Sequence, residues 1–142
     1  MKIFIFAFTK QIGMQIIKKL DLEFQRKIKA YAKDQETGYV QQFEFMHSEH
    51  SLERASQRAI NDFRIKIALV YGDTIRKQGY EFCILGEDRI PEDLLRYKDK
   101  LKNTVVVMDG QSDTLVTCYR AKDPYKQIRK KPKMLLTQRM AA

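Results

Sequence analysis

The order of sequence patterns predicts an α+β fold, in which helical segments come first and mostly antiparallel strands follow. Helical spacing of apolar residues dominates the first half of the chain, and short runs bounded by glycine and turn residues dominate the second half. The chain has 142 residues, of which 44% are hydrophobic. This is enough for one domain with a buried core, and it argues against disorder along the whole chain.

The first 46 residues are predicted to form an N-terminal extension. The apolar run Ile3–Phe8 is too short for a signal peptide and lacks a cleavage site of small residues, so it predicts a buried strand or the start of a helix. A helix is predicted from about Lys10 to Lys33, because apolar side chains recur with helical spacing at Leu20, Phe24, Ile28 and Tyr31. The segment Tyr39–Met46 has the character of a strand.

Two helices are predicted in the segment that follows. Ser48 is a suitable N-cap, and the helix after it is expected to run to about Ile60. Asn61 or Asp62 caps the next helix, which ends at Gly72.

Strands are predicted for most of the remaining chain up to residue 120. Residues 74–85 are expected to form two short strands around Gly79, and a short helix with Pro91 in its first turn follows them. Thr104–Met108 and Thr114–Arg120 are expected to pair through the turn-rich loop at residues 109–113. We therefore predict a central domain at residues 47–120, between the extension (1–46) and a C-terminal tail (121–142).

A row of basic side chains and histidine is predicted on the first central helix. His50, Arg54 and Arg58 are four residues apart and lie within roughly 80° of one another on a helix. An imidazole exchanges protons near neutral pH, and guanidinium groups hold phosphate, so the row suits chemistry on phosphodiesters. A solvated helix face with ordinary arginines is the alternative. His47 and His50 have a feasible spacing for a metal, but no Cys or third His lies near them in sequence.

The last predicted strand carries polar side chains that suit an anion site. Alternation places Leu115, Thr117 and Tyr119 on one face, and Val116, Cys118 and Arg120 on the other. The Tyr ring is also suited to stacking on a base. An ordinary strand, rich in Thr and Tyr for their β-propensity, is the alternative. Both cysteines, Cys83 and Cys118, are expected to be buried, which fits a cytoplasmic, reducing setting.

These segments together resemble a known group of proteins. The motifs are His-Ser-Leu-Glu-Arg, Gln-Arg-Ala-Ile, Tyr-Gly-Asp, Val-Val-Val and Leu-Val-Thr-Cys-Tyr-Arg. They resemble small bacterial domains similar to toxins of the barnase–EndoU–colicin–RelE fold. The resemblance implies N-terminal helices packed on a small antiparallel sheet of about four strands, as in RelE- and ParE-like proteins. It also implies a metal-independent ribonuclease that needs no cofactor.

The resemblance also implies which residues form the catalytic site. It places the family's helix histidine at His50 and its helix arginines at Arg54 and Arg58. The polar residues of its closing strand fall on Thr117, Tyr119 and Arg120. In this hypothesis the 2′-OH of RNA attacks its own phosphate, and a 2′,3′-cyclic phosphate results. The alternatives are a nucleic-acid-binding or gyrase-inhibiting module without catalysis, and an inactive relative that binds a partner.

The positive charge of the chain lies at its ends. The chain carries 27 basic and 18 acidic side chains, a net charge of +9, but residues 47–120 are neutral overall. The tail is therefore the predicted nucleic-acid-binding segment, through Lys126, Arg129, Lys130, Lys131 and Lys133. The expected partners are RNA as substrate, a cognate antitoxin or immunity protein, and a second copy of the chain. No membrane is expected, because no apolar run approaches the ~18 residues of a spanning helix.

Overall fold

The computed structural model describes residues 3–5, 26–34 and 36–134 of the chain. Its strands are β1 (Ile3–Ile5), β2 (Lys27–Asp34), β3 (Val40–His47), β4 (Asp73–Lys77), β5 (Tyr80–Leu85), β6 (Thr104–Asp109) and β7 (Thr114–Arg120). Its α-helices are α2 (Glu49–Gln57), α3 (Asp62–Tyr71), α4 (Lys98–Leu101) and α5 (Pro124–Arg129). Two 3-10 helices, η1 (Glu87–Arg89) and η2 (Glu92–Tyr97), precede α4.

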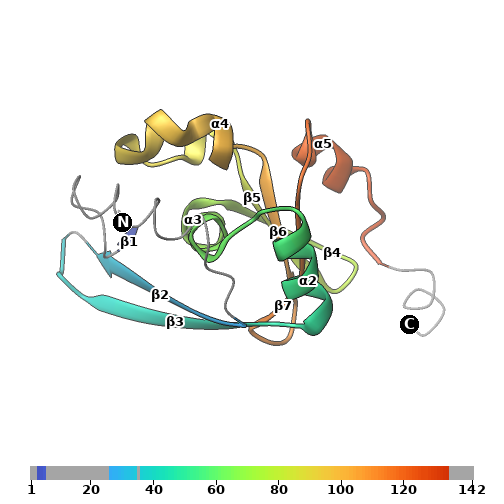
Figure 1. The fold of residues 1–142 in the computed structure, drawn as a ribbon, viewed down its shortest axis with the longest axis horizontal. Helices are drawn as coiled ribbons and strands as arrows, with labels where there is room; N and C mark the ends of the chain where they lie inside the picture. The colour runs from blue at the N-terminus through green and yellow to red at the C-terminus, as the bar shows by residue number, and fades with distance from the viewer. Residues whose placement is uncertain (1–2, 6–25, 35, 135–142) are drawn as a thin grey trace.

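The described strands form one mixed sheet of seven, in the order β1-β2-β3-β7-β6-β5-β4. All neighbouring pairs are antiparallel except β3 and β7, which are parallel and pair only through Met46 with Thr114 and His47 with Leu115. Figure 1 shows β2 and β3 as a long hairpin at one side of the molecule, with α5 beside β4 at the other. No helix of the described residues is long and apolar enough to cross a membrane.

The predicted fold class is wrong. The prediction was N-terminal helices on an antiparallel sheet of about four strands, but three strands precede α2 in the described chain and the sheet is mixed. The error comes from residues 27–33, which were predicted to be helical and instead form β2. Here Ile28 is buried between exposed Lys27 and Lys29, which is the two-residue alternation of a strand.

The other predictions for the N-terminal segment have mixed outcomes. Ile3–Ile5 forms a strand, and so does the segment predicted at Tyr39–Met46. Residues 6–25, which include Leu20 and Phe24 of the predicted helix, lie outside the described residues. The proposed division of the chain at residues 46 and 120 stays a prediction.

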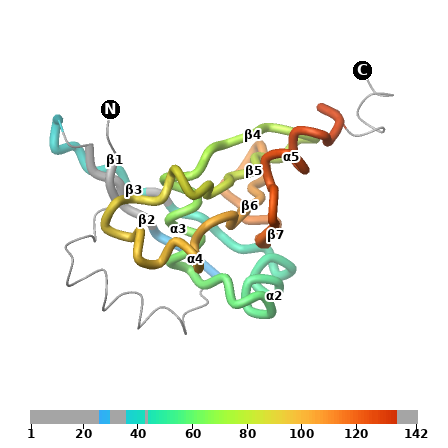
Figure 2. Tube along the Cα trace, turned by 90° about the horizontal axis from the view of Figure 1, so that it is seen from above, coloured from blue at the N-terminus to red at the C-terminus, as the bar shows by residue number. Residues whose placement is uncertain are grey.

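Two apolar clusters cover opposite faces of the sheet. The first cluster lies between the sheet and the helices α2 and α3, and it contains Cys83, Val106 and Cys118. The alternating neighbours Phe82, Ile84, Val105 and Val107 form the second cluster on the other face, together with Ile128 of α5. Figure 2 shows α2 and α5 on either side of β7, in agreement with this division.

The segment predicted as a basic tail is docked on the sheet through α5. Ile128 is fully buried, with an exposed fraction of 0%. The Tyr125 hydroxyl donates a hydrogen bond of 2.8 Å to Oδ2 of Asp73, and Arg89 forms an ion pair of 2.9 Å with Oδ1 of the same carboxylate. Lys77 Nζ donates to the carbonyl oxygens of Arg129 and Lys131, at 3.4 and 3.2 Å. These contacts hold α5 and the residues after it against the sheet. They therefore define where several basic side chains of the predicted tail lie, which the sequence alone does not show.

We expect Ile128→Ala to destabilise the protein, because it removes the side chain by which α5 enters the second cluster. A buried isoleucine truncated to alanine lowers the free energy of unfolding by about 2–5 kcal/mol. Urea unfolding followed by circular dichroism measures this change. Lys126→Ala is the control, since Lys126 is exposed on the same helix and its loss should change the free energy by less than about 0.5 kcal/mol. Equal stability of both variants would contradict the docking of α5.

Candidate functional site

Helix α2 begins with the cap that the sequence predicts. The Ser48 side chain accepts a hydrogen bond of 3.1 Å from the Ser51 backbone N–H, and Glu49 lies in the first turn, near the positive end of the helix dipole. Ser51 and Ala55 are fully buried, so small side chains let the helix approach the sheet closely. The helix packs mainly against β7.

Helix α2 also covers the open edge of β7. Strand β3 leaves β7 after Leu115, so the following carbonyl groups on that edge lack a strand partner. The Ser48 hydroxyl lies 3.5 Å from the carbonyl oxygen of Val116, and Arg58 Nη1 donates to that of Cys118 at 2.7 Å. Arg58 thus stabilises the edge of β7 through one N–H group, and the other N–H groups of its guanidinium can donate hydrogen bonds to a ligand.

The end of α2 directs the chain back into the core. Arg58 is the C-cap, and Ala59 has a left-handed backbone with φ of 53°. The N–H of the next residue, Ile60, donates to the carbonyl of Ala55 at 2.9 Å, which is the long bond of a Schellman motif. A glycine suits the left-handed backbone at the position of Ala59 better, because it has no Cβ. Burial of Ile60 holds the turn in place.

A surface cleft of about 700 Å³ lies where the end of α2 meets β7. It is lined by Ile60 and by four of the predicted catalytic residues, Arg58, Thr117, Tyr119 and Arg120. Arg120 is held by its Nη2 atom, which donates to the carbonyl oxygens of Asp99 at 2.6 Å and Lys102 at 3.3 Å. The cleft therefore combines two anchored guanidinium groups with two hydroxyl groups, which is a suitable set of donors for a phosphate.

The predicted alternation along β7 is wrong in its first part. The register of β6 and β7 shifts between Val107 and Met108, so that Val107 pairs with Thr117 but Met108 pairs with Leu115. Val116 is the extra residue of this bulge, which reverses the faces beyond it. Leu115 consequently lies in the first cluster, whereas Tyr119 packs against the second.

Burial in the cleft favours the protonated form of the Tyr119 hydroxyl. Burial raises the pKa of Tyr119, and the positive charge of Arg58 opposes part of that increase. Burial likewise raises the pKa of the neighbouring Cys118 thiol to about 11, against the lowering effect of Arg58. Tyr119 is thus available as a hydrogen-bond donor, and Cys118 is an unreactive thiol within the core.

The structure does not bring His50 and Arg54 into the cleft. Both are on α2 as predicted, but neither is among the residues that line the cleft. His50 is exposed in the first turn, and the eight residues to Arg58 correspond to about 12 Å along a helix. Arg54 Nη1 donates to Oε1 of Gln57 at 3.0 Å on the exposed surface. The predicted row is therefore divided between the two ends of α2.

His47 is buried at the end of β3, where the sequence analysis gave it a minor place. Its exposed fraction is 1%, and its Nδ1 lies 2.8 Å from the Ser51 hydroxyl. Its Nε2 is buried and has no hydrogen-bond partner among the residues that the structure describes. Burial lowers the pKa of His47 from 6.5 to about 4, so the ring is neutral at pH 7. The two-residue alternation of a strand was the signal that predicts this burial, because it places His47 on the same face as Phe45, which packs against the first cluster.

The predicted nucleic-acid-binding cations are carried by α5 and the residues after it. Lys126, Arg129, Lys130 and Lys133 are exposed. Lys131 is half-buried, with Nζ 5.9 Å from the centre of the Phe82 ring. Their binding to nucleic acid stays a prediction.

Comparisons with known proteins identify no relative of this chain. No protein-family model, no curated protein and no solved structure matches the chain. Within residues 3–5, 26–34 and 36–134, no group of three or more His, Cys, Asp or Glu side chains is placed to hold a metal ion. The family resemblance and the function it implies therefore stay predictions, and the cleft is what the structure contributes to them.

We expect the buried His47 to make the protein less stable in acid. Its pKa is about 4 in the folded protein and 6.5 in the unfolded chain, so the unfolded chain binds the proton first as the pH falls. His47 therefore costs no stability above pH 6.5, and it lowers the free energy of unfolding progressively between pH 6.5 and 4, by up to about 3 kcal/mol. Urea unfolding at a series of pH values measures this slope.

Two variants separate His47 from the rest of the molecule. His47→Leu combined with Ser51→Ala removes the buried imidazole and its hydroxyl partner, and should flatten the slope between pH 6.5 and 4. His50→Ala removes the exposed histidine and should keep the slope of the wild type. A slope that disappears in His50→Ala instead would contradict the assignment.

Proposed function

We propose that the protein is a ribonuclease that binds RNA in the cleft at the β7 edge and cleaves it by attack of the 2′-OH, without a metal. The observation that carries this proposal is the grouping of Arg58, Thr117, Tyr119 and Arg120 around one cleft. These residues come from two elements far apart in sequence. Two arginines and two hydroxyl groups at one surface hollow suit a phosphodiester better than they suit an uncharged ligand.

The cleft residues would act mainly by holding and stabilising the phosphate. As the 2′-oxygen attacks, negative charge increases on the non-bridging oxygens of phosphorus, and Arg54 and Arg58 would stabilise that charge. Arg120 and the Thr117 hydroxyl would hold the next phosphate of the strand in the cleft. Tyr119 would stack on a base there.

His50 is the proposed acceptor of the 2′-OH proton. Because His50 lies in the first turn of α2 and must contact the 2′-OH directly, this role requires the attacked phosphate to lie on the exposed side of the helix beside Arg54, with the next phosphate of the strand in the cleft. The reaction is then balanced: the proton leaves the 2′-OH to the imidazole, the bond from phosphorus to the 5′-oxygen breaks, and the 5′-oxygen receives a proton from water. The products are a 2′,3′-cyclic phosphate and a 5′-OH.

Binding without cleavage is the second candidate function. The observation that favours it is the absence of His50 from the cleft lining, so that Tyr119 is the one titratable group there besides the arginines. In this case the same cleft would hold the phosphates of a nucleic acid, and the RNA would remain intact.

A cleavage assay with purified protein separates the two candidates. We expect the wild type to cut single-stranded RNA and leave 2′,3′-cyclic phosphate ends, which end-mapping detects. His50→Ala should lower the rate by about a hundredfold or more, in the range of a lost general base, with little change in RNA affinity. Arg120→Ala should weaken both binding and cleavage, since it removes a phosphate contact.

Lys29→Ala is the matched control for these variants. Lys29 is an exposed cation on β2 and does not line the cleft, so its loss should leave the rate unchanged. Intact RNA with wild-type protein, together with weaker binding by Arg120→Ala, would favour the second candidate. Equal cleavage by wild type and His50→Ala would exclude the histidine from the reaction.

A further inference from the structure

The sheet face that α5 covers is only partly occupied by it. Tyr80, Val116 and Tyr119 are half-buried at the margin of the second cluster, on the same face as Ile128. The segment that contains α5 lies over β4 and β5, where it contacts Asp73, Lys77 and the Phe82 ring. Val105 and Val107 of β6 are buried, so this face presents aromatic and apolar side chains at its margins, Tyr119 and Val116 on β7 and Tyr80 on β5, next to a basic segment.

Two hollows lie at the ends of this face, and each contains a tyrosine and basic side chains. The first is the cleft with Tyr119, Arg58 and Arg120. The second, of about 600 Å³, lies between two hairpin turns, and its lining includes Arg76, Tyr80, Glu81, Asp109, Gln111 and Lys133. Of its acidic side chains, Glu81 is paired with Arg76 at 3.2 Å, and Asp109 accepts a hydrogen bond of 3.0 Å from the Gln111 N–H.

The strand register gives the spacing of the two tyrosines. Tyr119 pairs with Val105, which pairs with Ile84, and Tyr80 lies four residues before Ile84 on the same strand. Two strand spacings sideways and four residues along the strand correspond to about 17 Å. Five nucleotides at the spacing of a stacked strand cover that distance.

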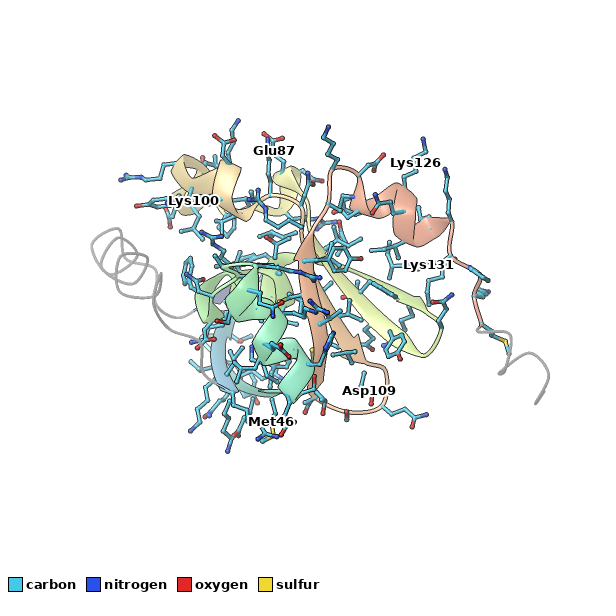
Figure 3. All side chains as sticks on the ribbon, turned by 45° about the vertical axis from the view of Figure 1, so that its right-hand side comes forward. Met46, Glu87, Lys100, Asp109, Lys126 and Lys131 are labelled. Atoms are coloured by element: carbon cyan, nitrogen blue, oxygen red, sulfur yellow. The ribbon has the colours of Figure 1, made fainter. Side chains whose placement is uncertain are left out.

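The charge beside this path is strongly positive. Residues 121–134 contain six basic side chains and one acidic one, Asp123, which caps α5. Figure 3 shows Lys126 and Lys131 on the same side of the molecule, with Lys100 on the opposite side. The ring of Tyr80 is packed at 85° to that of Phe82, with centroids 6.5 Å apart, so its orientation is fixed before a ligand arrives.

We propose that this face is a platform for single-stranded RNA, which leads the strand from the cleft at Tyr119 to a second stacking position at Tyr80. Cations of the α5 segment, Lys130 and Lys133 among them, contact the phosphates along the path. Single-stranded RNA fits because its bases are free to stack on the tyrosines, whereas the bases of a duplex are already stacked on each other. This inference rests on the proposed function in that RNA is the ligand, and it adds residues outside the cleft.

Binding of a 12-nucleotide single-stranded RNA, measured by fluorescence anisotropy at several salt concentrations, tests the platform. The probe carries 2′-O-methyl groups on every sugar, so that attack by a 2′-OH cannot destroy it. Tyr80→Leu should weaken binding by about five- to a hundredfold, the range for loss of one stacking residue, whereas Tyr80→Phe keeps the ring and should bind like the wild type. A duplex of the same length should bind at least tenfold more weakly.

A second set of variants tests the contacts between the lysines of the platform and the phosphates. Lys130→Gln with Lys133→Gln should reduce the slope of log affinity against log salt by about 1.4, which corresponds to two lost phosphate contacts on a single strand. Lys100→Gln, on the opposite side, should leave the slope unchanged. These substitutions are on exposed residues, so they decide the question even if Tyr80→Leu proves unstable in a thermal melt.

The outcomes for the platform and for the proposed function differ. If the Tyr80→Leu variant and the double lysine variant both bind the RNA as tightly as the wild type does, the platform is overturned. The proposal for the cleft is not affected by that result. Tight binding that depends on Tyr80, with no cleavage of unmodified RNA, supports the platform and overturns the ribonuclease. Equal binding of duplex RNA, or equal competition by polyglutamate, shows charge attraction alone and overturns the platform.

Discussion

The site depends on how the open edge of β7 is satisfied. Because β3 pairs with β7 only as far as Leu115, the rest of that edge would present unpaired carbonyl groups at the surface. Helix α2 covers the edge with polar side chains, and Arg58 reaches the last of the covered carbonyls, that of Cys118. The position of this arginine is therefore set by backbone hydrogen bonding, and a ligand in the cleft meets a guanidinium group that is already anchored.

Several elements could be predicted from the sequence because their signals are local. The caps at Ser48 and Asn61 and the end of the second helix at Gly72 depend on a few neighbouring residues, and the structure confirms them. The hairpins around Gly79 and residues 109–113 are confirmed for the same reason. Each of these features is decided by backbone geometry within one turn of chain.

The features that the sequence did not predict depend on distant partners. Strand β2 is stabilised by pairing with β1 and β3, and the helical spacing of Ile28 and Tyr31 carries no information about those partners. The parallel contact of His47 with Leu115 joins residues that are far apart in the chain. The site shows the same limit: spacing aligns His50 with Arg58 on one helix, but it does not reveal that the cleft forms at the Arg58 end of that helix.

The docked α5 has a consequence for folding as well as for charge. Without residues 124–129, the face with Phe82, Ile84, Val105 and Val107 loses its cover, and aromatic and β-branched side chains of adjacent strands are open to solvent. Such a surface favours association of partly folded chains. Proteolytic removal of this segment would therefore do more than lower the net charge, since it would expose an apolar surface that is prone to aggregate. While α5 remains attached, its basic residues have a second use, because repulsion between like charges on neighbouring chains opposes association.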